Sequence, residues 1–124
     1  MRTAFHLAFN VTDLDRARAF YGGVIGAAEG RSTETWIDFD LFGHQISVHL
    51  GDPFRSENTG RVGEHMVPMP HFGVVLPLDE WQALAARLEA AGLVMEQPVK
   101  SVAATLILLA IAIDGLVFHA HVRG

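Results

Sequence analysis

Histidine is the residue type that could carry chemistry in this chain, with seven copies among 124 residues. Imidazole is a common ligand for zinc, iron, manganese, nickel and copper, and several imidazoles on converging strands can bind one ion and leave a position open. The sequence contains no cysteine, which excludes a disulfide framework, a thiolate metal site and a cysteine nucleophile. The chemistry therefore depends on which histidines share a face.

Histidines occur on several predicted strands, and alternation places them opposite the apolar residues. A single strand histidine is usually structural, so the shared face, rather than any one residue, favours a metal site. Periodicity alone does not establish that these side chains converge. The candidates are His6, His49, His71, His119 and His121.

Other polar residues have less specific roles. Asp38 and Gln45 lie on the same predicted face, where either could hold a ligand histidine in one tautomer or be solvated. His44 and His65 fall in turns or in a connector, so we expect both to be solvated.

The predicted elements repeat, in the order β-α-β-β-β. A shift of 65 residues places His6 on His71 and aligns the two halves, which indicates an internal repeat. A segment rich in Gly, Pro, Ser and Asn separates them. We therefore predict one domain, 1–124, with a first module at 4–50, a connector at 51–70 and a second module at 71–122.

Charge and hydropathy exclude several function classes. The net charge is −5, and the single lysine and eight arginines are scattered, which argues against nucleic-acid binding. The longest apolar run, Val102 to Ile113, has 12 residues, below the roughly 20 that cross a bilayer. The N-terminus lacks signal-peptide features, so we expect a cytoplasmic protein that acts on small molecules.

Three segments carry a family resemblance: FHLAFNVTDLDRARAFYGGVIG, TWIDFDLFGHQ and PHFGVVLPLDEWQALAARLEAAG. They resemble the vicinal oxygen chelate superfamily, which includes glyoxalases, bleomycin-resistance proteins and extradiol dioxygenases. The nearest likeness is to its small bacterial predicted-dioxygenase branch. The resemblance implies an α+β fold in which two paired βαβββ modules form one cupped mixed sheet with helices outside. It also implies a divalent transition metal (Fe, Zn, Mn, Ni or Co) and a homodimer.

The resemblance also implies a ligand set, namely His6, His71, His49 and a glutamate on the last strand. This chain has no glutamate after Glu96. Alignment on Gly115 puts His119 in that position, the apolar pattern puts Val117 there, and matching the two halves pairs His49 with His121. All three candidates share a face. We favour His119, giving His6, His71, His119 and His49 as predicted metal ligands.

The last two strands depart from the family. The segment VAATLILLAIAI is shorter and more apolar than the polar loop of relatives. Two explanations stay open: a divergent natural copy, or an engineered chain whose last strands were rebuilt.

The first hypothesis is a metal-dependent enzyme, either a dioxygenase or a lyase/isomerase, whose metal binds two adjacent oxygens of a small molecule. The alternative is a non-catalytic small-molecule-binding protein of bleomycin-resistance type, or an engineered variant of the scaffold.

Overall fold

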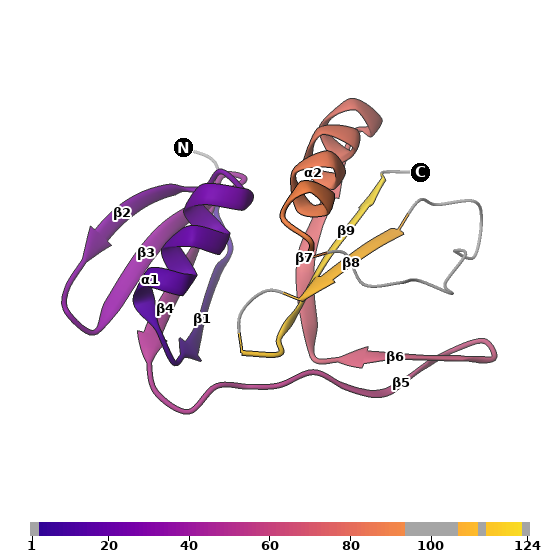
Figure 1. Ribbon diagram of the computed structural model, residues 1–124, viewed down its shortest axis with the longest axis horizontal. Helices are drawn as coiled ribbons and strands as arrows, with labels where there is room; N and C mark the ends of the chain where they lie inside the picture. Colours follow the sequence, from indigo (N-terminus) through magenta and orange to yellow (C-terminus); the bar gives the residue numbers. More distant parts are fainter. Residues whose placement is uncertain (1–2, 94–106, 112–113, 123–124) are drawn as a thin grey trace. The chain divides into compact units, whose positions relative to one another are not determined.

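The computed structural model describes residues 3–93, 107–111 and 114–122, and it divides into two compact units, 1–54 and 55–124 (Figure 1). Each unit combines a β-sheet with helical structure, so the predicted α+β fold class is confirmed. No helix within the described ranges is both long and apolar enough to span a membrane.

The first unit is a four-stranded sheet with strand order β1-β4-β3-β2. Strand β1 is parallel to β4, and the other neighbours are antiparallel. The elements are β1 (His6–Val11), α1 (Leu14–Ala17), the π-helical η1 (Arg18–Val24), β2 (Ala28–Ser32), β3 (Trp36–Leu41) and β4 (His44–Leu50).

Alternation along these strands separates an apolar face from a polar one. The apolar set packs with the helical segment, and Tyr21 lies at its centre with its ring 4.8 Å from that of Phe20 and 5.7 Å from that of Phe39. His6 of β1 and His49 of β4 belong to the other face. The buried set consists of Phe9, Val11, Ala17, Phe20, Tyr21, Ile25, Ile37, Phe39, Leu41, Ile46 and Val48.

Helix α1 is capped by Asp13, whose carboxylate accepts a hydrogen bond of 3.0 Å from the Arg16 N–H. Aspartate is among the best N-cap residues, because its side chain accepts from the free N–H groups of the first turn. Asp13 has the extended backbone conformation that a cap needs.

The second unit contains a three-stranded sheet with strand order β7-β9-β8 and a separate two-stranded ribbon, β5-β6. Strands β7 and β9 are parallel, and β8 is antiparallel to β9. The elements are β5 (Glu57–Val62), β6 (His65–Met69), β7 (His71–Leu76), α2 (Leu78–Ala90), β8 (Ile107–Ile111) and β9 (Val117–Val122).

The β5-β6 ribbon occupies much of the segment predicted as a connector. Its composition is typical of a loop, but a turn at Gly63, with φ of 59°, lets the two strands pair locally.

Helix α2 covers one face of the second sheet through Leu84, Ala85 and Leu88. The Trp81 indole N–H donates to the backbone carbonyl of Ala120 at 3.1 Å. Phe118 and Ala120 are fully buried. Because side chains alternate along a strand, His119 and His121 face away from α2, as the sequence pattern predicts.

Candidate metal-binding site

Parallel pairing of β7 with β9 brings three histidines together in the second unit. The register joins His71 to Val117, Gly73 to His119 and Val75 to His121. The His71 and His119 rings lie 5.0 Å apart, centroid to centroid, with their planes at 85°. The His119 and His121 rings are also 5.0 Å apart, with their planes at 9°. The three rings thus form a contiguous row.

The geometry of the first pair suits one shared ion. Two imidazoles on a tetrahedral ion have ring centres about 5 Å apart, because each ligating nitrogen lies about 2 Å from the metal. A bound ion also lies close to the plane of each ring. The planes of His71 and His119 are steeply inclined and intersect, as this condition requires, whereas those of His119 and His121 are nearly parallel.

A backbone contact fixes the tautomer of His71. Its Nδ1 lies 2.7 Å from the carbonyl oxygen of Pro68. Since a carbonyl oxygen can only accept, Nδ1 carries a proton, and in the neutral form of the ring the lone pair lies on Nε2. Histidines that bind metals through Nε2 commonly have this arrangement.

His119 is half-buried, and its Nε2 is fully buried with no hydrogen-bond partner among the described residues. Burial, together with charge repulsion from the neighbouring His71 and His121, lowers the pKa of His119 to about 4. The ring is therefore neutral at pH 7. A buried polar atom without a partner requires an explanation, and a bound ion would give Nε2 one.

Gly73 allows the close approach of the two strands. A Cβ at this position would collide with the backbone carbonyl of His119. Gly73 was not among the predicted functional residues, although a glycine inside a strand often marks a close backbone approach.

In the first unit, His6 and His49 share a face but lie at opposite ends of the β1-β4 pair. His6 is opposite Gln45, and His49 is opposite Asn10. Four residues along a strand separate Cα positions by about 13 Å. The structure therefore does not bring these two rings together. The His49 ring instead stacks on Trp36, with centroids 6.1 Å apart.

Asp38 is buried on the polar face of the first sheet, and its two oxygens have separate partners. Oδ1 accepts from the Ser47 hydroxyl at 2.5 Å, and Oδ2 accepts from Arg31 at 3.1 and 3.2 Å. The Ser47 hydrogen bond is the main cause that lowers the pKa of Asp38. The Gln45 amide donates to the Ser47 hydroxyl at 3.4 Å. Neither Asp38 nor Gln45 is hydrogen-bonded to a histidine within the described ranges.

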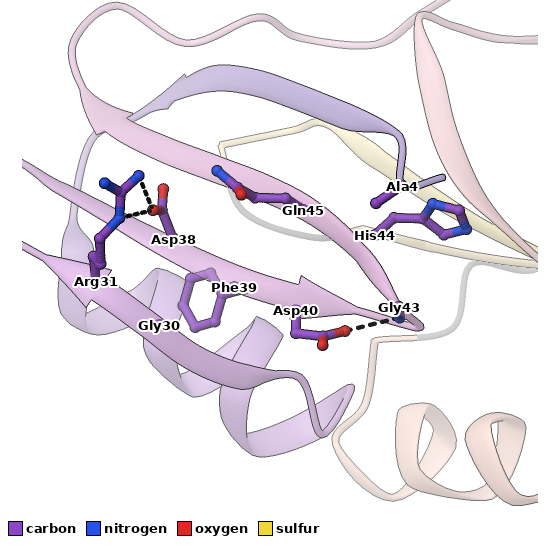
Figure 2. Close-up of a pocket in the computed structure, with 9 residues that line it drawn as sticks. All are labelled: Ala4, Gly30, Arg31, Asp38, Phe39, Asp40, Gly43, His44 and Gln45. Atoms are coloured by element: carbon purple, nitrogen blue, oxygen red, sulfur yellow. Dashed lines mark hydrogen bonds and ion pairs between the residues drawn. The ribbon is translucent and has the colours of Figure 1, made fainter. Parts of the chain in front are cut away.

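A pocket of about 360 Å³ lies against the first sheet. Figure 2 shows the residues that line it, among them the Arg31–Asp38 pair and Asp40. Asp40 accepts from the Gly43 N–H at 2.8 Å. The expectation that His44 is only solvated misses one contact, since its Nδ1 accepts from the Phe5 N–H at 2.9 Å. The lining residues are Ala4, Gly30, Arg31, Asp38, Phe39, Asp40, Gly43, His44 and Gln45.

Across the described ranges, no three histidine, aspartate or glutamate side chains form a group ready to hold a metal ion. The His71–His119 pair is therefore a two-donor arrangement, whose further ligands are not assembled around it.

The sequence profile of the Glyoxalase/Bleomycin resistance protein/Dioxygenase superfamily matches residues 3–109. The chain belongs to this superfamily. The resemblance drawn from the sequence motifs is thereby confirmed. The comparison with curated proteins gave no match.

Solved structures of the superfamily share the fold. A glyoxalase/bleomycin resistance protein/dioxygenase from Alicyclobacillus acidocaldarius is 23% identical, with a TM-score of 0.73 over 99% of this chain and 95% of that one. The fosfomycin resistance protein FosX from Listeria monocytogenes is 20% identical, with a TM-score of 0.74 over 100% and 95%. A FosX structure from the same organism complexed with Mn(II) and sulfate is 18% identical, with a TM-score of 0.74 over 100% and 92%. At these identities the likeness concerns the fold.

Proposed function

We propose that this superfamily member is a metal-dependent protein that uses His71 and His119 to hold a divalent transition metal, to which a small molecule binds through adjacent oxygens. The observation that carries the proposal is the ring pair at 5.0 Å and 85°. The fixed tautomer of His71 and the unpartnered Nε2 of His119 support it independently. The FosX structure with Mn(II) supports manganese as the first metal to test.

His6 stays the predicted metal ligand of the first unit. It begins β1 as His71 begins β7, so it occupies the equivalent position in its unit. His6 and His49 lie at opposite ends of the β1-β4 pair, so only one of them can be a ligand of a given ion. The stacking of His49 on Trp36 favours His6.

A bound divalent ion would supply Lewis acidity to the two oxygens of the ligand. His71 and His119 would hold that ion through neutral imidazoles, so the site would keep the full positive charge of the metal. No carboxylate follows Glu96 except that of Asp114. His121, stacked on His119, is the neighbouring side chain on β9 that could accept a proton. The proposal thus covers dioxygenase-like and lyase- or isomerase-like reactions.

Metal uptake by the untagged, full-length protein tests the proposal. We expect about one equivalent of Mn²⁺, Zn²⁺, Ni²⁺, Co²⁺ or Fe²⁺ on titration, and loss of uptake in the His71→Ala/His119→Ala variant. His44→Asn is the control, since it removes an imidazole outside the proposed site and keeps a side-chain acceptor for the Phe5 N–H. Failure of the wild-type protein to take up any of these metals would refute the proposal.

The second candidate function is small-molecule binding without catalysis. The absence of a ready three-ligand group from the described residues favours it. In that case the double histidine variant would bind the ligand as tightly as wild type. A loss beyond about tenfold, or 1.4 kcal/mol, would count against this candidate.

The homodimer implied by the resemblance and the cytoplasmic location predicted from the sequence both stay predictions. Sedimentation of the untagged protein over a dilution series tests the dimer, and a stable monomer at micromolar concentration would contradict it.

A further inference from the structure

We infer that Ser56 is a positioning residue that selects His119, rather than Val117 or His121, as the partner of His71. The inference rests on the proposed function, in which the His71–His119 pair holds the metal. Ser56 lies just before β5 and is distant in sequence from both histidines, and nothing in its own sequence context indicates this role.

Ser56 joins three backbone positions around the start of β7 and β9. Its hydroxyl oxygen accepts from the Val117 N–H at 2.9 Å and donates to the carbonyl oxygen of Pro70. Its own N–H donates to the carbonyl oxygen of Gly115 at 3.0 Å. Pro70 immediately precedes β7, and Val117 is the first residue of β9. One side chain therefore ties together the two strand ends.

These contacts occur where the β7-β9 register begins, at the pair His71 and Val117. Val117, His119 and His121 all point to the same face, so a shift of β9 by two residues would preserve the buried face and exchange the residue beside Gly73. Side-chain burial therefore does not strongly distinguish these registers. The hydrogen bond between the Val117 N–H and the Ser56 hydroxyl does distinguish these registers, because Ser56 can accept from only one N–H of β9 at this position.

The chemistry of the link requires a hydroxyl. Ser56 is half-buried, and its oxygen accepts from one group while its hydrogen goes to another. Ser56→Ala removes both hydrogen bonds of the hydroxyl, so the Val117 N–H and the Pro70 carbonyl oxygen each lose a partner. Threonine retains both functions, whereas valine has the shape of threonine without the hydroxyl. Threonine and valine thus form a matched pair of substitutions.

The experiment measures Mn²⁺ and Zn²⁺ affinity by competition with a chelating indicator, using full-length Ser56→Thr, Ser56→Val and Ser56→Ala. We expect Ser56→Thr to stay within about threefold of wild type and the other two to bind at least tenfold more weakly. Far-ultraviolet circular dichroism confirms that each variant is folded. Equal affinity in the folded Ser56→Val and wild-type proteins would overturn the inference while leaving the proposed function intact.

A measurement that needs no metal distinguishes failure of the inference about Ser56 from failure of the proposed metal-binding function. The close contact of the His71 and His119 rings predicts a nuclear Overhauser effect between their ring protons, which we expect in wild type and Ser56→Thr and not in Ser56→Val. Its persistence in Ser56→Val would overturn the inference even if no metal binds. If the valine and alanine variants do not fold, hydrogen exchange in the wild type decides. Slow exchange of the Val117 N–H is expected, and exchange as fast as in an exposed loop would refute the link to Ser56.

Discussion

His71 and His119 lie on adjacent parallel strands with their ring centres 5.0 Å apart and their planes at 85°. The Nδ1 of His71 donates a hydrogen bond to the Pro68 carbonyl oxygen. The Nε2 of His119 is buried and has no hydrogen-bond partner among the described residues. The two rings therefore contact each other but differ in environment.

His119→Glu should restore the carboxylate that relatives carry on the last strand. We expect Mn²⁺ to bind at least as tightly as in wild type, because a carboxylate adds negative charge and manganese favours oxygen ligands. Isothermal titration calorimetry provides the measurement. His121→Glu is the control on the same face, and stronger Mn²⁺ binding in this control than in His119→Glu would contradict the assignment of His119.

Gly73→Ala should destabilise the second unit by about 1–3 kcal/mol, as overpacking typically does. The added Cβ would collide with the carbonyl of His119, so β7 and β9 would have to separate. Urea denaturation gives the free energy of unfolding. Gly30→Ala is the matched control, since its Cβ would make only ordinary contacts of 3.6 Å with Asp38. Equal effects of the two substitutions would argue against the close approach at Gly73.

Stability should fall as the pH decreases from about 6.5 to about 4. Burial lowers the pKa of His119 to about 4 in the folded protein, from the ordinary 6.5. In this interval the unfolded chain binds a proton that the folded chain excludes, which favours unfolding by at most about 3 kcal/mol. Urea denaturation at pH 7 and pH 5 measures the change. His119→Gln should show a smaller pH dependence than wild type, and an unchanged dependence would exclude His119 as its source.

Ser47→Ala should destabilise the first unit more than Arg31→Ala. The Ser47 hydroxyl donates to buried Asp38, and loss of a hydrogen bond to a buried charged group costs about 1–3 kcal/mol. Arg31 is 80% exposed, and exposed ion pairs contribute about 1 kcal/mol or less. Chemical denaturation of both variants measures the order. A larger loss from Arg31→Ala would indicate that the guanidinium, rather than the hydroxyl, stabilises Asp38.

Much of the fold and part of the site could be predicted from residue patterns. Alternation placed His119 and His121 opposite the buried face of β9, and the motifs at the start of each half identified the superfamily. The ribbon at β5-β6 was missed, because its polar, glycine-containing strands have the composition of a loop. The roles of Gly73 and Ser56 were missed because each depends on backbone atoms distant in the sequence.

The sequence by itself determined which residues share a face, since the side chains of a strand alternate with a period of two. The same period made Val117, His119 and His121 equivalent, because they differ by two and four positions. Only the tertiary structure shows which of the three contacts the His71 ring. The backbone register sets His119 beside Gly73, and this places its ring against that of His71. It likewise separated His6 from His49, whose positions along two paired strands depend on long-range hydrogen bonds rather than on local pattern.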